Sequence, residues 1–298
     1  MIRRFLFIWA VVSPVCCAFS QQTVAFPYPD IPSTLVEPQE RLTFVLNHFW
    51  EQYHFDDTTL SNRRIAEQGI ADFLNLLNYE SDSALCRRAV DAFVEKGFAN
   101  EAQRGYFEQK LTHYLSNPES PLRNESVYAH FLRGIVAYLP ASDAIAERST
   151  QMLRLIGMNA VGDVATDFCF RLRDGQQKRL SDIKSPFTLL IFSDPECEHC
   201  REALPRLVAE DALKDERLSV LLVYPDSNTP HWLKVQRSLP ANWWDVCSPN
   251  GEIMRSPLYH LPSLPSLYLL DARKCVLIKD GTLEQVTDAL HRAKDSTP

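Results

Sequence analysis

The sequence predicts an all-α domain followed by an α/β domain, and three observations lead to this fold class. Apolar residues recur at helical spacing from Gln39 to about Ile156. After Gly157, short apolar runs typical of strands replace that pattern. These runs are separated by a helical segment, which is the order of an α/β layer arrangement. We therefore expect a helical domain over residues 21–156 and a second domain over residues 157–298.

In the first half, we expect a bundle or array of six helices. The first covers QERLTFVLNHFWEQY, where one apolar stripe continues to Tyr53. The other five are expected to begin near Ser61, after Asp82, after Asn100, at the cap Asn124 and at Ser142. Aromatic residues at this spacing indicate a core more than a ligand groove. The scattered histidines lack the partners of a metal site.

In the second half, a hairpin is expected around Asp174–Gly175, with one strand at 187–192 and another at 218–224. Both strands are continuous apolar runs, as buried parallel strands are. A helix is expected between them, from about Cys197 to Leu213. Two further strands at 266–271 and 275–280 and a last helix after Thr282 complete the layer.

The first residues predict a cleavable signal peptide over residues 1–20. Arg3 and Arg4 precede a short apolar stretch interrupted by Pro14, and Ala18-Phe19-Ser20 supplies small residues at the cleavage site. An uncleaved anchor and a lipoprotein anchored through Cys16 or Cys17 are less favoured alternatives. No later segment is apolar enough to span a bilayer, so we expect a soluble protein in the periplasm or cell envelope.

The overall charge argues against nucleic acid as a partner. The formal net charge is -7 and the sequence pI is near 5.6, whereas a nucleic-acid surface normally needs clustered Lys and Arg.

Two cysteines lie at the junction of a predicted strand and a predicted helix, Cys197 and Cys200 in the motif CEHC. A sulfur at a helix start lies near unpaired backbone N–H groups and the positive end of the helix dipole, and both favour the thiolate. Cys200, one turn later, lies on the same face and can close a disulfide with Cys197. The pattern predicts a redox pair in which Cys197 attacks and Cys200 resolves the mixed disulfide.

Other uses of the cysteine pair are less favoured. A structural zinc site usually takes a second cysteine pair or a spaced histidine pair, and the sequence has neither. We therefore expect no metal and no other cofactor. A static disulfide is the remaining alternative. The other cysteines are read first as buried free thiols, with pairing or electron relay as alternatives for the last two: Cys86, Cys169, Cys247 and Cys275.

A proline immediately before a strand strengthens the redox interpretation. Pro265 follows a long connection that returns the chain to the sheet. If its peptide bond is cis, the backbone at Leu264 is exposed and can pair with the extended chain of a substrate beside the cysteines. Pro262 is the competing candidate, and an ordinary trans proline at a strand start is the simpler alternative.

Residues 157–298 resemble the thioredoxin-like superfamily, and specifically the TlpA/ResA type of envelope thiol–disulfide oxidoreductase. The resemblance rests on GDVATDF, DGQQKRLSDI, CEHC and PSLYLLD. It implies a thioredoxin fold with Cys197 as nucleophile, Cys200 as resolving thiol and Pro265 as cis-proline. The first half, with FPYPDIP, HFWEQYHFDD and SPLRNES, resembles a helical domain of unknown function that is fused ahead of such domains in Gram-negative envelope proteins.

The site departs from the family pattern at two positions. Glu196 stands where the family commonly has Trp, and Ala203 stands where some reductive members carry a buried Glu. Glu196 and Glu198 are expected to disfavour the thiolate at Cys197, whereas a charged His199 favours it. These opposing effects leave the direction, oxidation or reduction, open.

The function predicted from the sequence is that of an extracytoplasmic thiol–disulfide oxidoreductase. It would exchange disulfides with envelope proteins and with an upstream electron donor or acceptor. The alternative is a non-enzymatic envelope adaptor, in which the helical half binds a partner and the cysteines form a structural disulfide. A peroxide-reducing enzyme of the same fold is disfavoured, because Asp194-Pro195-Glu196 supplies no Thr or Ser shortly before the first cysteine.

Overall fold

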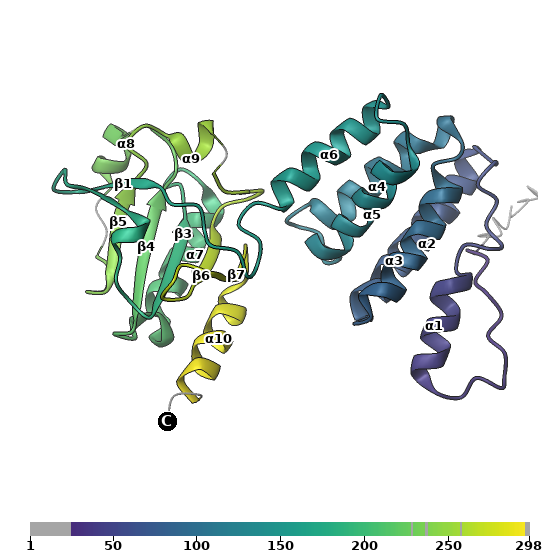
Figure 1. Ribbon diagram of the computed structural model, residues 1–298, viewed down its shortest axis with the longest axis horizontal. Helices are drawn as coiled ribbons and strands as arrows, with labels where there is room; N and C mark the ends of the chain where they lie inside the picture. Colours follow the sequence, from purple (N-terminus) through teal and green to yellow (C-terminus); the bar gives the residue numbers. More distant parts are fainter. Residues whose placement is uncertain (1–24, 228, 236–237, 257, 296–298) are drawn as a thin grey trace, which may run out of the picture.

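The structure, a computed structural model, describes residues 25–227, 229–235, 238–256 and 258–295. A helical domain and a sheet domain lie end to end, with α1 farthest from the sheet and α6 leading toward it (Figure 1). The predicted signal peptide lies outside the described residues. Among the described residues, no helix is both long enough and apolar enough to cross a membrane.

The described part of the helical domain contains six helices, as predicted. They are α1 (Pro38–His48), α2 (Leu60–Tyr79), α3 (Ser83–Gly97), α4 (Glu101–Ser116), α5 (Glu125–Tyr138) and α6 (Ala144–Ile156). Five begin with a side chain that accepts a hydrogen bond from the first turn: Thr59, Asp82, Asn100, Asn124 and Asp143. The cap of α6 is Asp143, where the sequence had suggested Ser142.

The first helix is shorter than predicted. α1 ends at His48, and the chain then turns so that Phe49, Trp50 and Tyr53 join a buried aromatic cluster with Phe26. The side chain of Asn62 fixes this turn, donating to the Tyr53 hydroxyl at 2.8 Å and also to two turn carbonyls. A continuous stripe to Tyr53 was therefore the wrong interpretation, although its aromatic residues are core residues, as expected.

The second half forms one seven-stranded sheet in the order β2-β1-β5-β4-β3-β6-β7. The strands are β1 (Cys169–Leu172), β2 (Gln177–Arg179), β3 (Phe187–Phe192), β4 (Leu218–Tyr224), β5 (Trp243–Cys247), β6 (Ser266–Leu270) and β7 (Val276–Ile278). β3 is parallel to β4 and β4 is parallel to β5, while β6 runs antiparallel to β3. The predicted fold class, an α/β domain after an all-α domain, is confirmed.

Each face of the sheet buries its own apolar layer. On one face, β3 and β4 pack against α7 (Glu198–Ala209), η2 (Asp211–Lys214) and α10 (Leu283–Asp295). On the other face, they pack beneath η1 (Leu180–Asp182), α9 (Glu252–Arg255) and the segment that leads to β6. The central strands are thus buried on both sides, which explains their unbroken apolar sequences.

Two elements of this half differ from the prediction. The helix expected to reach Leu213 ends at Ala209, and a separate 3-10 turn, η2, follows it. The segment read as a polar excursion contains α8 (Thr229–Lys234) and the strand β5. β5 is short and has the charged, half-buried Asp245 at its centre, which hid it from a search for apolar runs.

The connection between the domains runs beside the last strand. Asn159 has a positive φ of 50° and donates through Nδ2 to the Leu258 carbonyl at 2.7 Å. Farther on, Val164 forms a β-bridge with Cys275, and the amide of Val276 donates to the Asp163 carbonyl at 2.8 Å. The linker is therefore bonded to the sheet domain along β7.

Candidate active site

The first cysteine of CEHC lies at the start of a helix. Cys197 is the N-terminal cap of α7, and its side chain makes no capping hydrogen bond. The turn before it is held by Asp194, whose carboxylate accepts from the Glu196 amide and whose carbonyl accepts from the Cys197 amide. Unpaired N–H groups of the first helical turn therefore lie near the half-buried Cys197 sulfur and can stabilise negative charge on it.

The second cysteine is buried one turn later. Cys200 is 3% exposed, and this burial raises the pKa of its thiol to about 11. A hydrogen bond with the Cys197 sulfur also raises the pKa, while bonds from Asp194 and Ser193 lower it. At neutral pH Cys200 is thus a protonated thiol that can donate to Cys197. None of the six described cysteines forms a disulfide in this structure.

The proline segment lies directly against the first cysteine. The peptide bond between Leu264 and Pro265 is cis, and the Cys197 Sγ lies 3.5 Å from the Leu264 carbonyl oxygen. The two segments meet because Phe192, at the end of β3, is the antiparallel partner of Ser266, at the start of β6. The structure therefore brings together Cys197, Leu264 and Pro265, three residues that the sequence singled out.

The three charged residues around the pair are exposed. Glu196, Glu198 and His199 all face solvent. Glu196 Oε1 lies 3.6 Å from Nδ1 of His231 in α8, so its carboxylate is close to a neighbouring element. Within the described ranges, no group of three or more His, Cys, Asp or Glu side chains could hold a metal ion.

Sequence reasoning missed the element that borders this site. α8 is fixed on the sheet by Arg173, whose guanidinium lies 4.8 Å from the Trp232 ring and 2.7 Å from the Asp245 carboxylate. Asp245 also accepts from the Trp232 indole at 2.7 Å. This arrangement holds His231 near Glu196. In the sequence, the one hint of this arrangement was the pair of tryptophans before Asp245. That pair does not indicate that Arg173, far away in the sequence, contacts Asp245.

The four other cysteines lie away from CEHC in the sequence. Cys86 is buried in the helical core, where burial raises the pKa of its thiol. Cys247 is fully buried beside Tyr224 and Trp232. Cys169 and Cys275 are half-buried.

Comparison with known proteins identifies the architecture. Residues 12–159 match a family described as a domain of unknown function (DUF5106). A solved structure described as a thioredoxin-like protein from Bacteroides caccae is similar with a TM-score of 0.82 and 29% identity, covering 90% of this chain and 98% of that one. The chain is a thioredoxin-like protein. Its helical domain corresponds to the segment of unknown function.

Two other similarities concern parts of this thioredoxin-like protein. It is 29% identical to protein disulfide-isomerase A5 of Bos taurus over 147 residues, 48% of this chain and 24% of that protein. The chain thus spans about a quarter of the length of this curated relative. The C-terminal domain of an uncharacterized protein from Bacteroides fragilis is 32% identical, covering 45% of this chain and 98% of that one, with a TM-score of 0.43.

Proposed function

We propose that the protein is an extracytoplasmic thiol–disulfide oxidoreductase that acts on protein substrates through Cys197 and Cys200. The observation that carries the proposal is the position of the Cys197 sulfur at the start of α7, 3.5 Å from the Leu264 carbonyl oxygen and one helical turn before the buried Cys200. An accessible nucleophile, a protonated resolving thiol and an adjacent backbone acceptor are the parts that disulfide exchange requires.

Reduction of a substrate would proceed in two exchanges. The Cys197 thiolate attacks one sulfur of the substrate disulfide, a mixed disulfide forms, and the other substrate sulfur leaves as a thiolate and takes up a proton. Cys200 then loses its proton and attacks the Cys197 sulfur. The Cys197–Cys200 disulfide forms, the mixed disulfide breaks, and the second substrate thiol departs. The substrate gains the two electrons that the cysteine pair loses, and oxidation of a substrate is the reverse.

The Leu264–Pro265 segment has a binding role in this proposal. An extended substrate chain that paired with the backbone at Leu264 would bring its disulfide to the Cys197 sulfur. An upstream protein thiol or disulfide would then restore the starting state. The signal sequence expected over residues 1–20 supports a location in the periplasm or envelope.

The proposal is tested with the full-length chain. Wild type, Cys197→Ser and Cys200→Ser are compared for reduction of insulin by dithiothreitol. Both substitutions should abolish catalysed turnover, and Cys200→Ser should accumulate mixed disulfides on Cys197. Exchange by Cys197→Ser at the wild-type rate would refute the proposal. A reduction potential well below about -300 mV would instead support the adaptor with a structural disulfide.

A further inference from the structure

The segment that carries Leu264 lies between the two domains. His260 and Pro262 of this segment line a small space of about 10 Å³ with residues of the helical domain: Leu115, Ser116, Arg123, Glu125, Tyr128, Met152 and Ile156. On the sheet side, the Tyr268 hydroxyl donates to the His260 carbonyl at 2.8 Å. The helical domain therefore forms part of the packing around the substrate-binding segment.

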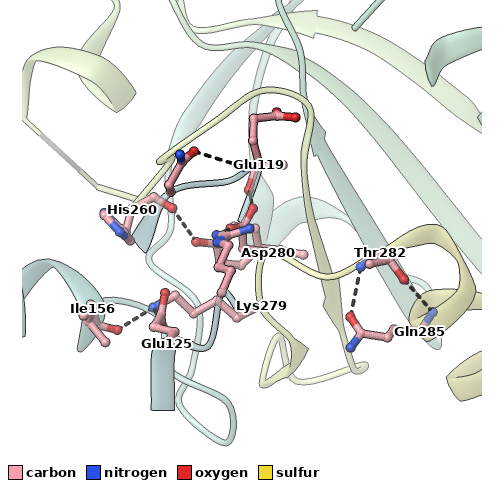
Figure 2. Close-up of polar contacts among 12 residues, drawn as sticks. Glu119, Glu125, Ile156, His260, Lys279, Asp280, Thr282 and Gln285 are labelled. Atoms are coloured by element: carbon pink, nitrogen blue, oxygen red, sulfur yellow. Dashed lines mark hydrogen bonds and ion pairs between the residues drawn. The ribbon is translucent and has the colours of Figure 1, made fainter. Parts of the chain in front are cut away.

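A line of polar contacts connects the helical domain to the residue after the cis-proline. Arg123, in the connection before α5, forms an ion pair with Asp280, which follows β7. Asp280 also accepts a hydrogen bond from the Ser266 hydroxyl at 2.6 Å. Figure 2 shows Asp280 in this region beside Lys279. Since Ser266 directly follows Pro265, one ion pair and one hydrogen bond connect the helical domain to the backbone that faces Cys197.

Burial makes the loss of one partner of this ion pair more costly than it is for an ordinary surface pair. The Asp280 side chain is only 8% exposed, and the Arg123 side chain is 27% exposed. A buried carboxylate that loses its cationic partner keeps its desolvation penalty without compensation. Removal of the Arg123 charge would therefore leave the Asp280 carboxylate without its cation and favour its rearrangement toward solvent. That rearrangement would weaken its hydrogen bond with Ser266.

A second ion pair between the domains offers a matched control. Lys279 Nζ lies 2.5 Å from a Glu125 carboxylate oxygen and donates to the Ile156 carbonyl at the end of α6 (Figure 2). This pair also joins the domains, but neither side chain has a described bond to residues 264–266. Its loss would weaken the interface but leave the Asp280–Ser266 hydrogen bond in place.

We infer that Arg123 of the helical domain is a positioning residue for the redox site, and that it holds the Leu264–Pro265 backbone in place for protein substrates through Asp280 and Ser266. This inference rests on the proposed function. It gives the domain of unknown function a specific task, because an extended chain needs a fixed backbone edge to pair with. A small disulfide that reacts directly at the Cys197 sulfur does not need that edge.

The test compares two disulfide substrates in the full-length chain. Arg123→Gln is expected to raise the KM for insulin roughly tenfold, as a displaced binding group does, and to change the rate with 5,5′-dithiobis(2-nitrobenzoic acid) less than twofold. Glu125→Gln should leave both values near wild type. Arg123→Lys keeps the charge and should recover part of the lost affinity. An unchanged KM in Arg123→Gln, or an equal rise in Glu125→Gln, would overturn the inference.

Further variants keep the test decisive if Arg123→Gln fails to fold. Ser266→Ala and Asp280→Asn interrupt the same line of contacts, and asparagine tolerates the positive φ of 46° at position 280. In the double variant, the losses of insulin affinity caused by Arg123→Gln and by Ser266→Ala should be less than additive, because both substitutions interrupt the same connection.

A structural measurement separates this inference from the proposed function. Amide hydrogen exchange over 258–270 should accelerate in Arg123→Gln and in Asp280→Asn but not in Glu125→Gln. Inactivity of wild type toward both disulfides would refute the proposed function. Unchanged amide hydrogen exchange in both Arg123→Gln and Asp280→Asn would refute the positioning role of Arg123.

Discussion

The two thiols of CEHC differ in burial, although they lie one helical turn apart. Cys197 is half-buried at the helix start, whereas Cys200 is buried and has a pKa of about 11. Iodoacetamide at pH 7 should therefore modify Cys197 well before Cys200, because only thiolates react appreciably. Peptide mass spectrometry over a time course measures both sites. Equal rates at the two cysteines would contradict the assignment of nucleophile and resolving thiol.

The acidic residue before the nucleophile provides a second test on the scale of single residues. Glu196 is exposed and its carboxylate faces His231 at 3.6 Å. Glu196→Gln removes a negative charge next to Cys197, so the thiolate should form more readily and alkylation of Cys197 should be roughly two- to fivefold faster, the range for an exposed charge pair. Glu202→Gln, exposed farther along α7, should change the rate less. A slower rate in Glu196→Gln would show that the carboxylate assists the reaction.

Among the secondary-structure elements, two helical glycines have opposite surroundings. A Cβ on Gly69 in α2 would lie 2.2 Å from the ring of Phe26, while a Cβ on Gly105 in α4 would have open space around it. Gly69→Ala should therefore lower the free energy of unfolding by about 1–3 kcal/mol through overpacking. Gly105→Ala should raise it by about 0.5–1 kcal/mol through helix propensity. Urea unfolding followed by circular dichroism checks both, and stabilisation by Gly69→Ala would be evidence against tight packing of Phe26.

Elements that depend on local sequence could be predicted well. Asp82, Asn100 and Asn124 identified helix starts because a cap acts within its own first turn. The strands at 187–192 and 218–224 were recognisable because both of their faces are buried. β5 was missed because its pairing with β4 and β1, and not its composition, makes it a strand. The end of α1 was missed because it depends on the side chain of Asn62, fourteen residues after His48.

At the scale of the whole molecule, sequence reasoning identified the residues of the candidate site but not their surroundings. CEHC and Pro265 stand out by motif and position. Arg123 and Asp280 are 157 residues apart and belong to different domains, so no spacing rule connects them. No spacing rule connects Arg173 and Trp232 either, although both lie in the sheet domain. Contacts between distant charged residues depend on the final docking of the elements, which a single sequence does not encode in any local pattern.

The interface between the domains also predicts a pH dependence. Burial lowers the pKa of His260 below its ordinary 6.5; Glu125 and Asp280 oppose this shift, while Lys279 and Arg123 add to it. Below pH 6.5 the unfolded chain therefore binds a proton at this histidine before the folded chain does. The contribution of His260 to stability is complete above pH 6.5 and is lost as the pH falls toward its folded pKa.

His260→Asn should thus reduce the loss of stability between pH 7 and pH 5.5. Thermal unfolding midpoints at several pH values measure this slope. The exposed His291 of α10 provides a control, because His291→Asn should leave the slope near that of wild type. Identical slopes in His260→Asn and wild type would contradict burial of this histidine in the folded chain.

The linker that runs along β7 has a consequence for truncated versions of the protein. Residues 162–165 form hydrogen bonds with the outer edge of the sheet at β7. Val164 forms the β-bridge with Cys275, the Asp163 carbonyl accepts from Val276, and the Ala165 amide donates to the Lys274 carbonyl at 2.8 Å. At the opposite margin, β2 carries Lys178 and Arg179, charged side chains that discourage strand addition by a second copy. A sheet-domain fragment that begins after Ala165 would expose β7 as an unpaired edge strand and would be prone to self-association. A fragment that begins at Gly157 would keep the linker that pairs with this edge.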